Sequence, residues 1–303
     1  MIRVGPAGWS YPDWERRVYP RAKPRGFHPL TLLAAHLDGV ELNSTFYALP
    51  RAENAARWTE LVQPWPAFRF VAKLLQGFTH APYDEARWDS DARAFRAGLA
   101  PLLRQRLLSA VLVQFPIGFQ HGAHEIRRLG HVRTLFDDLP LVLEVRHHSW
   151  FTPPALDAIR GLGYSLAPGD LPSAWNHPPE RHAPTGPIGY LRLHGRNAEQ
   201  WFRAGAGRDD RYDYLYPPPE LGALARKATS IERETSETWV VTNNHFGGQA
   251  VANALELKYL LGRRQPVPAW PEIVAAFPHL AGITRVAGQG GLFGGVGQFR
   301  SDP

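Results

Sequence analysis

The amino-acid sequence predicts an α/β protein, a single (β/α)8 barrel of TIM type, regular or irregular, with a glycine-rich C-terminal tail. Two observations predict this fold. About eight short apolar runs alternate with helical patterns, which is typical of a parallel sheet. The length of 303 residues suits one barrel with extensions. We therefore expect a barrel domain at residues 1–265, and an extension with a flexible glycine-rich tail at 266–303.

The predicted strands are short and rich in Val, Leu and Ile. They cover residues 2–9, 39–46, 69–74, 110–115, 141–146, 164–168, 190–194 and 239–243. The predicted helices lie between them, at residues 30–37, 52–61, 89–106, 124–135, 153–162, 218–233 and 249–262. Nearly continuous apolar strands fit a sheet that helices cover.

Composition restricts the class of protein. Hydrophobic residues make up 44% of the chain and charged residues 20%, as in folded globular proteins. No apolar stretch reaches the roughly 18 residues that span a bilayer, and the N-terminus lacks a secretory pattern, so we expect a cytoplasmic protein without a membrane partner. The absence of cysteine excludes disulfides, thiolate metal sites and cysteine nucleophiles. The sequence predicts no oligomeric state.

The chain is basic, with a net charge of +6 and a pI near 9.7. This excess of positive charge favours anionic partners. No run of like charges forms a basic tail, so a mildly basic enzyme surface explains the charge. Nucleic-acid binding or processing remains an alternative, and a non-catalytic metabolite-binding barrel is another.

Polar side chains stand at the ends of the predicted strands. These residues are Ser10, Asn43, Lys73, Gln114, Glu144, Arg146, Asp170, Arg192, His194, Asn243, Asn244 and His245. In a parallel barrel these ends meet on one face, where active sites lie. Alternate residues of a strand share a face, so Glu41 is expected to point inward with Asn43. Buried polar groups without partners cost roughly 1 to 3 kcal/mol each, which favours a functional site over a structural one.

Four of these side chains are candidate catalytic groups. The carboxylates of Glu41 and Glu144 are expected to divide acid and base roles, with Glu144 ionised next to Arg146. His194 is expected to carry protons near neutral pH. Lys73 is expected to stabilise negative charge or to form a Schiff base. The alternative for each of them is a structural buried ion pair.

Lys73 is notable because the chain has few lysines. The others are Lys23, Lys227 and Lys258, whereas Lys and Arg together number 34. A buried lysine can lose its proton and an arginine cannot, so a lysine within a strand suits chemistry that needs a neutral amine. The alternative is a lysine whose apolar stem is buried and whose ammonium reaches a carboxylate.

The remaining strand-end residues are candidate substrate-binding groups. They are the aromatic residues Trp9, Tyr11 and Tyr47, and the polar residues Asn43, Gln114, Arg146, Asp170, Arg192, Asn243 and Asn244. Together they favour a small anionic or polyhydroxylated substrate. The long connection at 195–219 carries Arg196, Arg203, Arg208 and Arg211. We interpret it as an anion clamp or as a solvated loop.

We predict no metal site and no cofactor. Enough oxygen and nitrogen donors exist for a divalent metal, namely Glu41, Glu144, Asp170, His194 and His245. Xylose-isomerase-like barrels bind metals with such ligands at the same face. However, Lys73, Arg146 and Arg192 would compete for the carboxylates and repel a cation, so the metal stays an alternative.

Several motifs resemble, in order, those of the domain-of-unknown-function 72 family. They are GWSYPDW, VELNSTFYALP, FVAKLLQGFTH, LVQFP, LEVRHHSW, YLRLHGR, YDYLY, and TNNH followed by GGQAVANA. The resemblance spans residues 4–261, and it implies a TIM-type barrel but no particular activity. It adds His80 to the candidate substrate-binding residues. Ala7 departs from the small polar residue that the family more usually has there.

Overall fold

The computed structural model describes residues 1–179 and 182–286. Its strands are β1 (Ile2–Pro6), β2 (Gly39–Leu42), β3 (Arg69–Lys73), β4 (Leu108–Gln114), β5 (Leu141–Glu144), β6 (Ser165–Leu166), β7 (Gly169–Asp170), β8 (Ile188–Leu193), β9 (Glu237–Thr242), β10 (Val267–Ala269) and β11 (Thr284–Val286). Two parallel sheets form the centre, with strand orders β1-β9-β8-β7 and β2-β3-β4-β5-β6. The protein therefore has a mixed α/β fold with parallel sheets.

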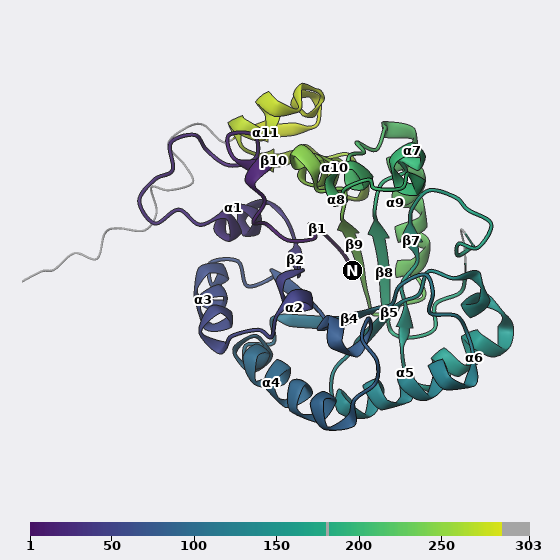
Figure 1. Ribbon diagram of the computed structural model, residues 1–303. Helices are drawn as coiled ribbons and strands as arrows, with labels where there is room; N and C mark the ends of the chain where they lie inside the picture. Colours follow the sequence, from purple (N-terminus) through teal and green to yellow (C-terminus); the bar gives the residue numbers. More distant parts are fainter. Residues whose placement is uncertain (180–181, 287–303) are drawn as a thin grey trace, which may run out of the picture.

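Helices cover the outside of these sheets. They are α1 (Pro29–His36), α2 (Ser44–Tyr47), α3 (Ala52–Val62), α4 (Glu85–Arg104), α5 (Ala123–Leu135), α6 (Pro153–Gly161), α7 (Ala198–Phe202), α8 (Arg208–Tyr212), α9 (Pro218–Glu232), α10 (Gln249–Leu261) and α11 (Pro271–Ala276). In Figure 1, α3 to α6 follow one another around the outside of β2 to β5. Within the described ranges, no helix has the length and apolar character needed to cross a bilayer.

Most predicted elements are present with slightly different ends. The first predicted strand extended to residue 9, but β1 ends at Pro6. The helix predicted at 89–106 begins earlier, at Glu85, because the Asp84 carboxylate accepts a hydrogen bond from the Arg87 amide (3.1 Å). The short strand β7 was not predicted; it pairs with β8 and belongs to a different sheet from β6.

The strands form two hydrogen-bonded sheets rather than one continuous ladder. Between β1 and β2 the backbone contacts include the bridge Ala7–Glu41 and a hydrogen bond from the Asp38 amide to the Val4 carbonyl (3.0 Å). Between β6 and β8, Ser165 Oγ accepts a hydrogen bond from the Ile188 amide (3.1 Å). Pro168 follows β6 and has no N–H to donate, which interrupts the ladder at this edge.

The space between the two sheets has an apolar lower layer. It contains Ala7, Val71, Ala110, Leu112, Val142, Ala167, Ile188, Tyr190, Trp239 and Val241. Two residues further along several strands, the same face carries polar groups, as in the pairs Val71 and Lys73, and Val142 and Glu144. The polar residues therefore lie above the apolar layer, toward the carboxyl ends of the strands.

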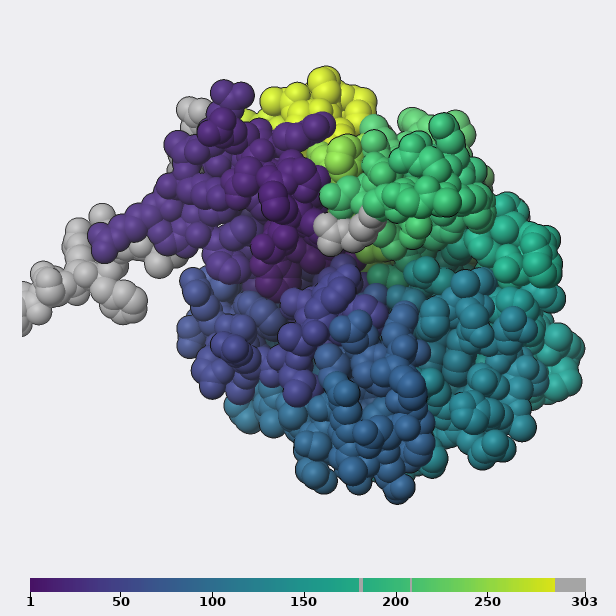
Figure 2. All heavy atoms as spheres, in the orientation of Figure 1, coloured from purple at the N-terminus to yellow at the C-terminus, as the bar shows by residue number. Residues whose placement is uncertain are grey.

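Segments from the two ends of the chain lie together. In Figure 2 the N-terminal part (purple) lies against the last described elements (yellow). The Trp270 indole N–H donates a hydrogen bond to the Val18 carbonyl (2.5 Å), and Trp270 is buried. Part of the predicted C-terminal extension is thus structured, as β10, α11 and β11. The glycine-rich tail at 287–303 lies outside the described residues.

Gly5 and Gly39 mark the close approach of β1 and β2. A Cβ on Gly5 would lie 1.9 Å from the Gly39 carbonyl oxygen. We expect Gly5→Ala to destabilise the protein by about 1 to 3 kcal/mol, because the backbone must move to admit a methyl group. Urea unfolding measures this effect. Gly118→Ala is the control, since no atom lies within 4 Å of that Cβ position; an equal loss in both variants would contradict the prediction.

Candidate active site

A buried arginine joins two buried carboxylates at the centre of the site. Arg192, in β8, donates from Nη2 to Glu41 Oε1 (2.7 Å) and from Nε to Glu41 Oε2 (3.0 Å). Its Nη1 donates to Glu144 Oε2 (2.6 Å). Glu41 in β2 and Glu144 in β5 belong to the same five-stranded sheet, so Arg192, which comes from β8, links the two sheets. Such bidentate, charge-assisted hydrogen bonds are among the strongest in proteins.

Further hydrogen bonds extend this network. The Tyr190 hydroxyl donates to Glu41 Oε2 (2.8 Å), and Arg146 Nε donates to Glu144 Oε1 (3.0 Å). Burial alone raises the pKa of Glu144, but Arg192, His194 and Arg146 together hold it well below its usual range. Glu144 is thus ionised at neutral pH.

His194 is completely buried beside this network. Its Nε2 lies 3.4 Å from Glu144 Oε1, and its Nδ1 lies 3.0 Å from Asn243 Nδ2. Burial lowers the pKa of His194 to about 4, although Glu144 opposes the shift. Burial therefore favours the neutral ring at neutral pH, because no water solvates its charge. The role of His194 as a proton carrier stays a prediction.

Lys73 is a cation of the site that has no carboxylate partner among the described residues. Its Nζ lies 4.0 Å from the centre of the Phe46 ring. Within residues 1–179 and 182–286, we find no ion pair or hydrogen bond of the ammonium group. Burial lowers the pKa of Lys73 to about 7, Arg192 adds to the shift, and Glu41 and Glu144 oppose it. A large part of the amine is therefore neutral at physiological pH.

A cavity of about 350 Å³ opens above these groups. The candidate residues that line it are Trp9, Tyr11, Asn43, Tyr47, Lys73, Gln114, Arg146, Arg192 and Asn243. The carboxylates of Glu41 and Glu144 lie beneath it, fully buried. Arg146 uses Nε to bind Glu144, and among the described residues neither terminal nitrogen has a hydrogen-bond partner. Arg146 can thus hold an anion in the cavity while it stays bound to Glu144.

Of the candidate catalytic residues, Glu41, Glu144 and His194 do not line the cavity, and neither do three candidate substrate-binding residues. Asp170 binds Arg196 through both carboxylate oxygens (2.6 and 2.9 Å). Asn244 is buried and donates to the Tyr214 carbonyl and to Asn253. His80 is exposed and contacts Phe46 ring to ring at 5.0 Å. The structure therefore places Asp170 and Asn244 in structural contacts, and His80 beside the aromatic ring that covers Lys73.

The connection at 195–219 contributes an aromatic ring to the cavity. Tyr212, in α8, lines it. Arg196 instead binds Asp170, and Arg203 binds Asp210 (3.3 Å). Arg196 and Arg203 thus each have an acidic partner within the protein, and the interpretation of this loop as an anion clamp stays a prediction.

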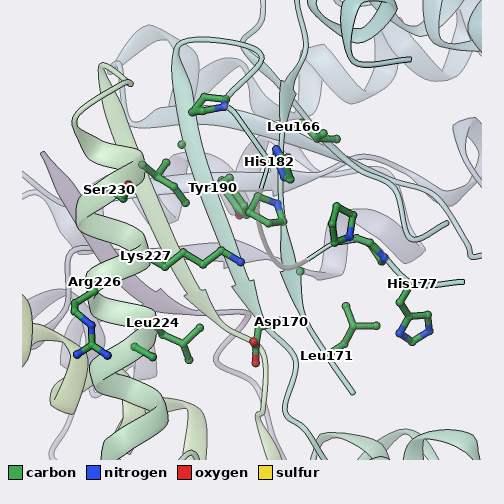
Figure 3. Close-up of a pocket in the computed structure, with 18 of the residues that line it drawn as sticks. Leu166, Asp170, Leu171, His177, His182, Tyr190, Leu224, Arg226, Lys227 and Ser230 are labelled. Carbon is green, nitrogen blue, oxygen red and sulfur yellow. The ribbon is translucent and has the colours of Figure 1, made fainter. Parts of the chain in front are cut away.

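A second, larger cavity of about 760 Å³ lies between α9 and the segment around β7. Figure 3 shows Lys227 extending from α9 toward the strands, with Asp170 and Tyr190 among the other lining residues. Many of its walls are proline and aliphatic side chains. Of its two acidic lining residues, Asp170 is already bound to Arg196. The smaller cavity is the one lined by Lys73 and Arg146 above the buried carboxylates, and we assign the candidate active site there.

The potential metal donors do not gather at one point. In the described part of the chain, no three His, Asp or Glu side chains are close enough to share an ion. Glu41 and Glu144 give their oxygens to arginine, and Asp170 lies elsewhere.

Sequence reasoning missed several residues of the site. Tyr190 was assigned no role, although it precedes Arg192 by two residues and so shares its face. His245 was predicted only as a polar strand-end residue and a potential metal donor, and it lines the cavity together with Tyr212. His245 follows Asn243 by two positions and stacks on Tyr11 at 4.5 Å between ring centres. Tyr212 begins the YDYLY motif, but it was not predicted as a site residue, because its position depends on how a long loop folds back.

The fold and the site define an α/β protein of parallel strands with a buried, charged centre at their carboxyl ends. A family model described as "Protein of unknown function DUF72" matches residues 3–274. The chain therefore belongs to the DUF72 family, which confirms the resemblance of the motifs.

Relatives and solved structures agree with this assignment. The chain is 30% identical over 275 residues to UPF0759 protein YunF of Bacillus subtilis, covering 86% of this chain and 95% of that protein. It is 32% identical over 155 residues to UPF0759 protein YecE of Escherichia coli K12, half of each chain. Crystal structures of DUF72 family proteins from Thermotoga maritima (TM-score 0.74, 30% identity, 86% of this chain and 99% of that one) and Enterococcus faecalis (TM-score 0.71, 30% identity, 86% and 98%) are similar.

Proposed function

We propose that this protein is an enzyme that performs metal-independent acid-base chemistry on a small anionic substrate. In this proposal the two sheets are the halves of an irregular TIM-type barrel, and the cavity is the active site at the carboxyl ends of its strands. The observation that carries it is the largely buried amine of Lys73, which faces the cavity without a carboxylate partner. A structural lysine would gain from an ion pair, whereas a lysine poised between its two protonation states suits proton transfer.

The charges around the cavity support an anionic substrate. The two buried carboxylates are balanced by Arg192 and Arg146, and Lys73 adds positive charge whenever it is protonated. Arg146 offers a planar pair of donors that matches a carboxylate or a phosphate. Trp9 and Tyr47 flank the opening and would cover the apolar or hydroxylated remainder of the substrate.

Anion binding tests the first part of this proposal. We expect lactate and inorganic phosphate to bind the wild-type protein in calorimetric titrations, and Arg146→Met to weaken binding by about tenfold or more, because a charge-assisted hydrogen-bond pair is lost. Arg160→Met is the control, since Arg160 is a surface residue paired with Asp157. Equal affinity in the Arg146→Met and wild-type proteins would refute this role of Arg146.

Turnover tests the second part. In a screen of small carboxylic acids, phosphate esters and sugars, we expect Lys73→Met to lower the rate on any substrate by at least about a hundredfold while the protein still binds anions. Tight ligand retention without turnover would favour the alternative of a non-catalytic metabolite-binding protein. Steeply salt-dependent binding of DNA or RNA would favour the nucleic-acid alternative.

A further inference from the structure

We propose that the substrate is a small carbonyl compound that carries a carboxylate or phosphate, and that Lys73 Nζ condenses with its carbonyl group to form an imine. This inference rests on the proposed function and names the substrate class and the covalent step. It follows from three features of the cavity: the amine, its surroundings and the position of Arg146.

The position and surroundings of the Lys73 amine suit a nucleophile. Lys73 ends β3 and lines the cavity, so its Nζ is open to a ligand. On the protein side it contacts the face of Phe46 at 4.0 Å, an apolar neighbour that takes no proton and makes no ion pair. Burial brings its pKa to about 7, so a neutral lone pair is available without a separate base.

The neighbours of the amine favour covalent chemistry over simple charge pairing. Glu41 and Glu144, the carboxylates nearest the centre, are held by Arg192 and Arg146, so neither is free to bind Lys73. A permanent anion-binding role alone would be served by a third arginine, which this arginine-rich chain uses elsewhere. A lysine is needed where the nitrogen must lose its proton.

Arg146 supplies the second point of recognition. It lines the same cavity as Lys73, and its charge contributes to lowering the pKa of that amine, so the two groups are neighbours. In the proposal, one small molecule therefore places its anionic group on Arg146 and its carbonyl carbon at Nζ. The cavity volume of about 350 Å³ restricts the substrate to a small molecule.

The condensation is balanced without any co-reactant. The nitrogen lone pair attacks the carbonyl carbon, and the electrons of the C–O π bond move to oxygen, which takes up a proton to give a carbinolamine. The C–O bond then breaks, and the oxygen leaves as water with the two hydrogens that the amine loses. A C=N bond replaces the C=O bond, with no oxidation or reduction.

Reductive trapping tests the inference. The protein is incubated with cyanoborohydride and one of four probes: pyruvate, dihydroxyacetone phosphate, hydroxyacetone or lactate. Pyruvate and the phosphate ester carry both an anion and a carbonyl, hydroxyacetone has the carbonyl alone, and lactate has the anion alone. Intact-protein mass and peptide mapping then report how much adduct forms and on which lysine.

We expect adduct on Lys73 with pyruvate or dihydroxyacetone phosphate, about tenfold more slowly with hydroxyacetone, and none with lactate. The faster of the two anionic probes identifies the carboxylate or the phosphate as the preferred group. Lys73→Met should abolish the adduct and Arg146→Met should slow it to the hydroxyacetone rate. Lys23→Met, which removes a surface lysine paired with Glu15, should leave it unchanged.

The same probes separate this inference from the proposed function. If lactate binds and Arg146→Met weakens it, but no probe labels Lys73, the imine is refuted and the anion site stands. If no anionic probe binds or labels, both proposals fail. Equal labelling by hydroxyacetone and pyruvate would refute the anionic requirement, and labelling spread evenly over all lysines would refute the special role of Lys73.

Discussion

Arg192→Met is expected to destabilise the protein by about 3 to 5 kcal/mol, because it leaves two buried carboxylates without their shared cation. Arg192 is 1% exposed and Glu41 is 0% exposed, so water cannot replace the lost hydrogen bonds. Urea or guanidinium unfolding monitored by tryptophan fluorescence measures the change.

Two comparisons make this result specific to the buried network. Arg160→Met breaks an ion pair whose arginine side chain is 49% exposed, and should change stability by about 0 to 1 kcal/mol. Adding Glu41→Gln and Glu144→Gln to Arg192→Met should recover much of the loss, since neither carboxylate is then left as a buried charge without its arginine. Similar losses for Arg192→Met and Arg160→Met would disprove the account.

Lys73→Met is expected to stabilise the protein by about 2 to 5 kcal/mol at pH 6, whatever it does to activity. A pKa lowered from 10.5 to about 7 corresponds to roughly 5 kcal/mol against the charged amine in the folded protein. Below pH 7 both the folded and unfolded chains carry this charge, so the folded protein bears the whole penalty. Methionine has a similar length and no charge, so the Lys73→Met variant does not carry this penalty.

The pH dependence of this gain has a definite sign. Between pH 7 and about 10 the unfolded chain holds a proton that the folded chain has released, so the stability contributed by Lys73 rises with pH. The advantage of Lys73→Met should therefore shrink by roughly 1.4 kcal/mol per pH unit over this interval. The exposed Lys23→Met variant should show no such trend. A stability difference that is the same at pH 6 and pH 9 would contradict the low pKa.

The sequence located the strands and most of the cavity lining because both depend on local periodicity. Residues two apart on one strand share a face, so Lys73 could be placed above Val71, and Glu144 above Val142, from their spacing alone. The convergence of these ends then followed from parallel strand order. The same reasoning applied to Tyr190 would have found the third group that binds the Glu41 network.

Protonation states and partners depended on neighbours that are distant in the sequence. His194 looked like a neutral-pH proton carrier, but complete burial keeps it neutral. Asp170 looked like a ligand of the site, but β7 pairs with β8 and directs its carboxylate to Arg196. The two sheets also separate at Pro168, which has no N–H for backbone pairing. The place of this break depends on how the chain returns to β8.

By itself, the sequence determined an α/β protein with polar residues gathered at strand ends, because alternation and parallel order are local rules that each strand obeys separately. Only the tertiary structure decided which charges neutralise one another. Arg192 joins two carboxylates of the opposite sheet, 151 and 48 residues away along the chain, and among the described residues this pairing leaves Lys73 without a counter-ion. Burial and Coulomb interactions act through space, so the reactivity of that amine is a property of the assembled fold.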